Sequence, residues 1–286
     1  MHPTAKSLTL DLLSSLRGQP MPVRALVAAA AVFGISAESM RVALVRLCSR
    51  GTIERNERGQ YRIAPAAQPV QAHVASWTRT EERLVPWRGG WIGVHTAGLE
   101  RGDRARVRRR ERALQFLGLR PLDAHLFVRP DNLKGGVDAA RGELQALGLE
   151  PTALVFAIAQ LDPTAEARAR ALWDGKALGR GYRATCAALE RSAARLEHTP
   201  AQRAMVESFL LGGQAIRQLA LDPLLPEPIV AAGERAALVE ALRAYDRLGR
   251  AHWRGFMTSH GAPHLQTPRT AVAAGWPQHS GTGVVA

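Results

Sequence analysis

The sequence has little cysteine and no long apolar run, and each shortage excludes a class of protein. The 286 residues include only two cysteines, Cys48 and Cys186, which are far apart and outside any C-x-x-C pair. We therefore expect neither a disulfide framework nor a zinc site, and we expect a cytoplasmic location. No apolar run reaches the roughly 18 residues that a membrane-spanning helix needs. No secretory signal peptide is predicted at the N-terminus.

Lysine is almost absent, although the chain is strongly basic. Three residues are lysine, and the remaining positive charge comes from arginine. Codon bias in a GC-rich genome accounts for the choice of arginine over lysine. It does not account for 38 basic against 25 acidic residues, or for the net charge of +13. This excess indicates a polyanionic partner, most simply nucleic acid.

Residues 1–66 have the pattern of a winged helix-turn-helix. Helices are predicted over 7–16 and 23–33, and Ser36 is a good N-cap for a third helix. In that helix an apolar stripe recurs at helical spacing through Met40, Ala43, Leu44, Leu47 and Cys48. "TIERN" and "QYRIA", joined by a turn that ends at a glycine, predict a β-hairpin.

The face opposite this stripe is the predicted DNA-reading surface. Arginine pairs with guanine and valine contacts thymine methyl groups in the major groove, while arginines on the wing suit phosphates. The predicted contacts to bases or nearby phosphates are Ser39, Arg41, Val42, Val45 and Arg46, and those to backbone phosphates are Arg50, Arg55, Arg58 and Arg62. The alternative is an ordinary solvated helix whose arginines reflect composition.

Further along the chain the pattern changes twice. Residues 83–162 alternate strands (90–96, 124–130, 152–160) with helices (104–117, 135–148), which predicts a ferredoxin-like α/β sandwich within an α+β protein. Residues 163–257 are almost all helical, with segments at 164–174, 176–196, 200–220 and 233–256. The stretch 65–70 is predicted to be a linker, and 258–286 a disordered tail.

Motifs for catalysis are missing. The sequence has no G-x-S-x-G, no H-E-x-x-H and no Walker A loop, and its nine histidines are scattered. We therefore predict no catalytic residue and no metal site. The arginine-rich stretch 101–112 is a solvated helix face or a surface that follows an anionic ligand.

Several short motifs in order resemble the PaaX-type transcriptional repressors of phenylacetate degradation. They are "FGIS" (33–36), "FVRP" (127–130), "LWDGKALGRGY" (172–182) and "DPLLPEPIV" (222–230). The resemblance implies a winged helix, a middle domain similar to Cas2 and a helical effector domain. It also implies a homodimer on double-stranded operator DNA that an aryl-coenzyme A thioester releases, with no further cofactor.

An aryl-coenzyme A carries phosphates and an apolar acyl end, so its site should combine arginine with aromatic residues. The predicted effector residues are Trp173, Tyr182, Arg183, Arg217, His252 and Trp253. The alternative is that Trp173, Tyr182 and Trp253 are core residues.

The sequence also departs from the family pattern. Valines stand at 42 and 45, where the family often has threonine and serine, and "GGQAIR" (212–217) replaces a more polar family segment. A different small aromatic ligand, either another aromatic acyl-coenzyme A or a free aromatic acid, is therefore an alternative effector. A nuclease would need an acidic residue at the end of the first strand, and "GGWIGVHTAG" has none. A structural DNA-binding protein without any ligand is a further alternative.

Overall fold

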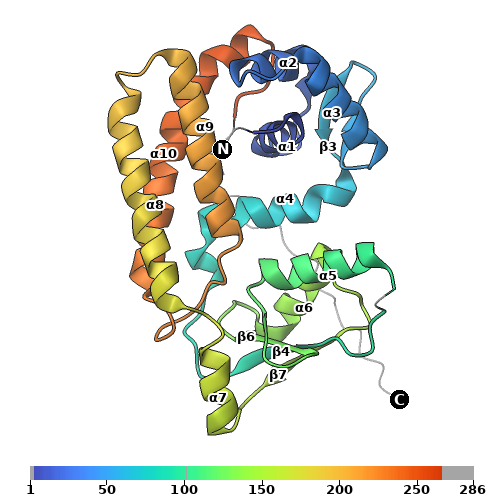
Figure 1. Ribbon diagram of the computed structural model, residues 1–286, viewed down its shortest axis with the longest axis vertical. Helices are drawn as coiled ribbons and strands as arrows, with labels where there is room; N and C mark the ends of the chain where they lie inside the picture. Colours follow the sequence, from blue (N-terminus) through green and yellow to red (C-terminus); the bar gives the residue numbers. More distant parts are fainter. Residues whose placement is uncertain (1–2, 101, 266–286) are drawn as a thin grey trace, which may run out of the picture.

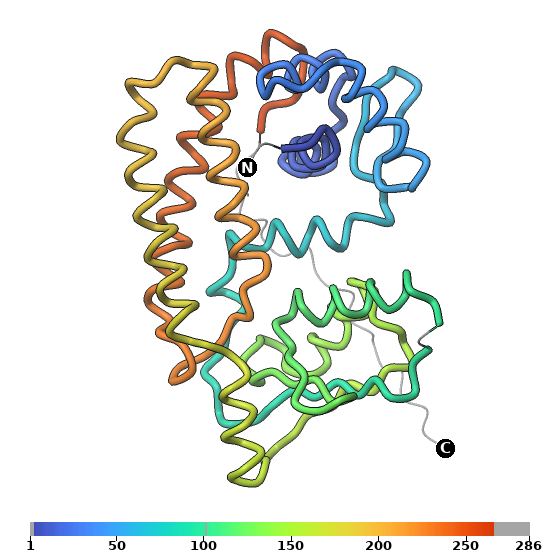
Figure 2. The backbone as a smooth tube through the Cα atoms, in the orientation of Figure 1, coloured from blue at the N-terminus to red at the C-terminus, as the bar shows by residue number. Residues whose placement is uncertain are grey.

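The computed structural model describes residues 3–100 and 102–265. The fold is α+β, with many helices and two small antiparallel sheets. The long helices α8 (Gly175–Leu196), α9 (Ala201–Ala220) and α10 (Ala232–Ser259) run along one side of the molecule (Figures 1 and 2). The N-terminal helices lie beside the upper end of these helices, and the larger sheet lies beyond their lower end. Among the described helices, none has the length and apolar character needed to cross a membrane.

The N-terminal unit contains the three predicted helices and the predicted hairpin. Its elements are α1 (Ala5–Ser15), β1 (Met21–Pro22), α2 (Val23–Val32), α3 (Ala37–Ser49), β2 (Ile53–Arg55) and β3 (Gln60–Ile63). The sheet has the order β1-β3-β2, and Met21 of β1 pairs with Tyr61 of β3. Strand β1 was not predicted, because a two-residue strand is too short to show a period.

The core of this unit is shared with the C-terminal helices. Met40, Leu44 and Leu47 of α3 are buried in a cluster with leucines of α1 and alanines of α2, which confirms the predicted stripe. Trp253 and Met257 belong to the same cluster. The N-terminal unit therefore packs firmly on the helical bundle.

The predicted linker at 65–70 is wrong. Residues Pro65–Ala67 form a 3-10 turn, η1, and continue directly into helix α4 (Gln68–Ala75). A proline-containing stretch after the hairpin favours a linker. Proline is also favoured in the first turn of a helix, where its missing N–H group costs no hydrogen bond. The 3-10 turns η2 (Ser76–Arg79) and η3 (Glu81–Arg83) follow.

Helix α4 connects the N-terminal unit to both other parts of the molecule. Its His73 is buried, with Nδ1 2.8 Å from Glu143 Oε1 of the middle domain and Nε2 3.0 Å from the carbonyl oxygen of Ala220. Arg83 donates to both oxygens of Glu143 at 2.9 Å. These polar contacts fix the orientation of α4.

The middle domain has four antiparallel strands and two helices. They are β4 (Trp91–His95), α5 (Arg104–Phe116), β5 (Arg120–Pro121), β6 (Leu126–Pro130), α6 (Gly136–Leu147) and β7 (Leu154–Ile158). The strand order is β5-β6-β4-β7. Ile92 and Val94 point to one face and are buried with leucines of α5 and α6. The predicted strands and helices are present, and β5 was again too short to predict.

The opposite face of this sheet is partly covered. Trp91 and Val128 belong to the core of the helical domain, and the ring of Trp91 stacks on Trp173 at 6.2 Å between centroids. Leu154 and Phe156 of edge strand β7 remain 63% and 38% exposed. An apolar patch is therefore open beside the covered part.

The helical domain matches the predicted segments within a few residues, except at α7, which ends four residues early. It consists of α7 (Pro163–Arg170), α8 (Gly175–Leu196), α9 (Ala201–Ala220) and α10 (Ala232–Ser259). Helix α10 continues two residues beyond the predicted boundary at 257. Ala262 and Leu265, predicted to lie in the tail, pack against the N-terminal core. The rest of the predicted tail, 266–286, lies outside the described residues.

Two of the motifs behind the family resemblance meet at the junction of the sheet with the helices. Asn132, two residues after "FVRP", donates from Nδ2 to the carbonyl oxygen of Leu224 in "DPLLP" at 2.7 Å. Arg129 of "FVRP" is fully buried and donates from Nη2 to Asn132 Oδ1 at 2.9 Å. The two motifs thus form one buried polar contact between domains.

Candidate DNA-binding surface and ligand cavity

Helix α3 begins where the sequence predicts. The Ser36 side chain accepts a hydrogen bond from the backbone N–H of Ser39 at 3.1 Å, and Glu38 lies in the first turn. A cap satisfies one of the free N–H groups of the first turn, and an acidic residue there interacts favourably with the helix dipole. The helix is therefore held firmly at the end that would enter a DNA groove.

The predicted base-reading residues all lie on the exposed side of α3. Arg41 and Arg46 are exposed, Val42 is 43% exposed and Val45 is 68% exposed. Ser39 is exposed too, but its hydroxyl already accepts a hydrogen bond from Ser36 at 2.9 Å. Two exposed valines with an exposed arginine on either side therefore form the solvent-facing surface of α3.

The predicted phosphate-contacting residues are also exposed. Arg50 follows α3, and Arg55, Arg58 and Arg62 lie on the hairpin. Arg62 is tied to Glu54 across the two strands at 2.5 Å, so part of its charge is neutralised. Within the described part of the chain no carboxylate pairs with Arg41, Arg46, Arg50, Arg55 or Arg58.

The six predicted effector residues do not converge. Trp173 and Tyr182 are buried in the core of the helical domain. Arg183 is exposed and paired with Glu234, while His252 is half-buried. Trp253 is 1% exposed in the N-terminal core and donates from Nε1 to the carbonyl oxygen of Met205 at 3.0 Å. Trp173, Tyr182 and Trp253 are therefore core residues, which agrees with the alternative interpretation.

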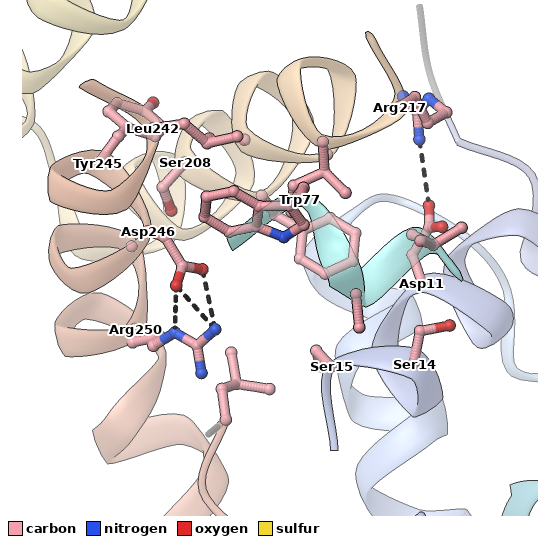
Figure 3. A pocket seen from close by; sticks show the side chains of 18 of the residues that line it. Asp11, Ser14, Ser15, Trp77, Ser208, Arg217, Leu242, Tyr245, Asp246 and Arg250 are labelled. Carbon is pink, nitrogen blue, oxygen red and sulfur yellow. Dashed lines mark hydrogen bonds and ion pairs between the residues drawn. The ribbon is translucent and has the colours of Figure 1, made fainter. Parts of the chain in front are cut away.

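Arg217 and Trp253 nevertheless line a common cavity. The cavity has a volume of about 350 Å³ and lies between α1, α4 and η2 on one side and α9 and α10 on the other (Figure 3). Its size falls at the lower end of the range for small-molecule sites, about 300–1,000 Å³. Gly212 and Gly213 of the "GGQAIR" segment also line it.

Two ion pairs lie in the cavity wall. Arg217 of α9 approaches Asp11 of α1 at 3.5 Å, and Arg250 donates from Nε and Nη2 to Asp246 at 2.8 and 3.0 Å (Figure 3). Burial raises the pKa of Asp11, and the charge of Arg217 opposes that rise. The Asp11 side chain is 40% exposed, so this carboxylate is only partly buried.

Sequence reasoning missed most of this cavity. The contributing residues come from segments far apart in the chain, so no single motif contains them. Two local signals were available. One is the glycine pair Gly212-Gly213 inside a long helix, where glycine is unfavourable. The other is the i, i+4 pair Asp246 and Arg250 on a helix that otherwise packs with apolar residues.

The arginines of helix α5 differ in their surroundings. Arg110 is buried and pairs with Glu150 at 2.8 Å, and Arg106 pairs with Glu100 at 3.1 Å. Arg104, Arg108, Arg109 and Arg112 are exposed. In the described residues, no group of three or more histidine, cysteine or acidic side chains has an arrangement that could hold a metal ion.

Comparisons with known proteins find a family match in the N-terminal unit. Residues 4–66 match the family described as PaaX-like protein. No curated protein matches the chain. Among solved structures the chain is similar to the uncharacterized protein Rv0674 from Mycobacterium tuberculosis. The sequence identity is 22%, the alignment covers 87% of this chain and 98% of the other, and the TM-score is 0.51. That likeness supports a common fold.

Proposed function

We propose that this protein, whose residues 4–66 match the PaaX-like family, is a DNA-binding transcription regulator that represses an operon for the breakdown of aromatic compounds. The observation that carries the proposal is the exposed face of α3. Val45 is 68% exposed between arginines that have no acidic partner in the described residues. Such a surface suits the major groove, where arginine can pair with guanine and valine can contact thymine methyl groups.

The arrangement around α3 supports a winged helix-turn-helix. The turn from α2 to α3 contains Gly34, whose φ of +71° lies in the left-handed region that favours glycine. The following hairpin, β2–β3, places Arg55 and Arg58 beyond the end of α3. In this interpretation α3 reads base edges and the hairpin is the wing that contacts backbone phosphates.

The middle domain has the order of elements expected for a ferredoxin-like fold. Its sequence is strand, helix, strand, strand, helix, strand, with the sheet order β5-β6-β4-β7. The first strand, β4, ends at His95, and neither His95 nor the following Thr96 carries a carboxylate. This supports a scaffold over the alternative of a nucleic-acid enzyme.

A homodimer would place two α3 helices on an inverted repeat. The open face of β7, where Leu154 and Phe156 are exposed, is the surface that we assign to the dimer. We expect Leu154→Asp to convert the dimer to a monomer in analytical ultracentrifugation. A dimer that survives this substitution would place the interface elsewhere. Val85→Asp, at another exposed valine, is the control.

An effector would act by a shift in population. Consider a ligand that binds more tightly to a dimer whose two α3 helices have the wrong spacing for DNA. Because ligand binding and DNA binding are thermodynamically linked, such a ligand must lower the affinity for DNA. The family resemblance suggests an aryl-coenzyme A thioester as the effector. The departure at "GGQAIR", which lines the cavity, favours the alternative of another small aromatic ligand.

The test is the salt dependence of DNA binding. Double-stranded fragments that the protein selects from a random pool are titrated by fluorescence anisotropy at several salt concentrations. Arg46→Ala should weaken binding. It should also reduce the steepness of the dependence of log affinity on log salt concentration by about one, because one fewer phosphate contact means that fewer counterions are released on binding. Arg191→Ala, an exposed arginine on α8, should change neither. Equal losses from both variants would reject the assignment of α3.

A further inference from the structure

The cavity lies where the DNA-binding unit meets the helical bundle. Helix α1 contributes Leu10, Asp11, Ser14 and Ser15 to one wall, and α9 and α10 form the facing wall. The volume of about 350 Å³ suits a compact organic molecule. A ligand here would touch both domains at once.

Most of the wall is apolar, and part of it is aromatic. The main apolar side chains are Leu10, Val74, Trp77, Phe209, Ile216 and Leu242. Gly212 and Gly213 widen the cavity from within α9. A methyl group on Gly212 would meet its nearest neighbour, the Tyr245 ring, at an ordinary 3.8 Å. Packing therefore does not require glycine there, although glycine weakens a helix.

One polar group in the wall lacks a partner. Arg250 is only 15% exposed, and two of its nitrogens are occupied by Asp246. Its third nitrogen, Nη1, is buried with no hydrogen-bond partner in the described part of the chain. A buried charged donor without an acceptor is costly, and native proteins usually satisfy such a group.

The surroundings of Arg250 are positive. Arg17 also lines the cavity and has a φ of +52°, a strained backbone conformation for a residue that is not glycine. Partial burial lowers the pKa of Arg17, and the like charges of Arg250 and Arg79 lower it further, whereas Asp246 opposes them. Arg17 and Arg250 thus both line the cavity, and of these two only Arg250 forms an ion pair with the Asp246 carboxylate in the described residues, so the positive charge of Arg17 is not balanced by that carboxylate.

We infer that this cavity binds a compact apolar carboxylic acid, whose carboxylate accepts from Arg250 Nη1 and faces Arg17 while its apolar part lies against Trp77 and Phe209. The carboxylate supplies the acceptor that Arg250 lacks and balances the local charge. The apolar part removes aromatic and aliphatic surface from water. A coenzyme A thioester of the same acid has no such carboxylate.

The position of the cavity suggests how the acid would regulate the protein, an extension that rests on the proposed function. Asp11 of α1 and Arg217 of α9 bridge the two walls. A ligand in the cavity would contact α1 and α10 together, and it would favour the relative position of the two helices to which it binds most tightly. The DNA-binding unit is thereby biased toward one placement on the bundle.

Calorimetry on the full chain without DNA tests the site. The probes are benzoate and 3-phenylpropanoate, their neutral amides, and benzoyl-coenzyme A. We expect saturable binding of at least one acid, with its amide weaker by about tenfold or more, because a charge-assisted hydrogen bond is lost. No heat with either acid, equal binding of acid and amide, or binding of benzoyl-coenzyme A alone would overturn the inference.

Variants locate the acid within the protein. Arg250→Gln and Arg17→Gln should each weaken its binding by about tenfold to a hundredfold. Gly213→Leu should block binding by filling the cavity. Arg191→Gln on α8 is the matched control and should bind as the wild type does. If Arg250→Gln unfolds, Arg17→Gln and Gly213→Leu decide the question, and unchanged binding in both would refute the site.

The same proteins separate this inference from the proposed function. Acid binding without any DNA affinity would keep the ligand site and reject the regulator. DNA binding without acid binding would keep the regulator and reject the ligand site.

Discussion

Asp11 of α1 and Arg217 of α9 form an ion pair at 3.5 Å across the cavity between the N-terminal unit and the helical bundle. Arg217 is the last residue of the "GGQAIR" segment (212–217) and lines the cavity. Its partner lies more than two hundred residues earlier in the chain. The contact therefore links this segment to the first helix of the N-terminal unit.

The first prediction concerns the pH dependence that Asp11 brings. Burial raises its pKa above the ordinary value of 3.8, although Arg217 opposes the rise. A carboxyl group with a raised pKa stabilises the folded state most when protonated, and this contribution is lost as the pH rises through the folded-state value. Relative to Asp11→Asn, the wild type should lose stability as the pH rises from below 3.8 toward neutrality.

Denaturant unfolding of both proteins across this pH range measures the effect. Asp138→Asn, at an exposed aspartate of α6, is the control. If the difference in unfolding free energy between wild type and Asp11→Asn stays constant across this pH range, burial does not raise the pKa of Asp11.

The second prediction concerns Glu143, which holds α4 through His73 and Arg83. Burial acts to raise its pKa, but the hydrogen bond from His73 and the charge of Arg83 outweigh burial and lower it. Glu143→Gln should therefore reduce the unfolding free energy by about 1–3 kcal/mol at neutral pH. The loss should shrink as the pH falls through the folded-state pKa of Glu143, because the wild-type carboxylate is then protonated.

Chemical unfolding at neutral and acidic pH provides the measurement. Asp138→Asn on the same helix removes only an exposed ion pair and should cost less than about 1 kcal/mol. A Glu143→Gln protein as stable as that control would mean that α4 is not held by this contact.

The third prediction concerns the cap of α3. Ser36→Ala removes the acceptor for the N–H of Ser39 and should lower stability by about 1 kcal/mol. Ser49→Ala, at the other end of the same helix, changes no cap acceptor and should have a smaller effect. The thermal midpoints of the two variants give the comparison, and a reversed order would exclude the cap as the reason that α3 begins at residue 37.

The sequence predicted the elements whose side chains repeat at a regular period. Met40, Leu44 and Leu47 defined α3, and Ser36 fixed its start. Strands β1 and β5 have two residues each and follow from pairing with strands elsewhere, for example Met21 with Tyr61. Local sequence carries no signal for such pairing.

The two candidate sites differ in how far the sequence predicted them. The exposed face of α3 was predictable because one amphipathic helix carries it. The cavity was not predictable, because α1, α4, α9 and α10 each contribute a few side chains and η2 contributes Trp77. The sequence favours Trp173 and Tyr182 as effector-binding aromatic residues because of their ring chemistry. In the structure both side chains are buried in the core of the helical domain.

The fourth prediction concerns sequence preference. Val45 would contact thymine methyl groups, so Val45→Thr should change the bases selected from a random duplex pool more than the overall affinity. Val85→Thr, another exposed valine, should leave the selected sequence unchanged. Identical selections by wild type and Val45→Thr would place this side chain away from the base edges.

The central claim is that the exposed face of α3 lies in a DNA groove, and photocrosslinking tests it most directly. A benzophenone amino acid replaces Val45 in one protein and Leu221, which is 44% exposed at the end of α9, in another. With selected duplex DNA, crosslinks to DNA should form from position 45 and be absent from position 221. Equal or reversed crosslinking would contradict the account.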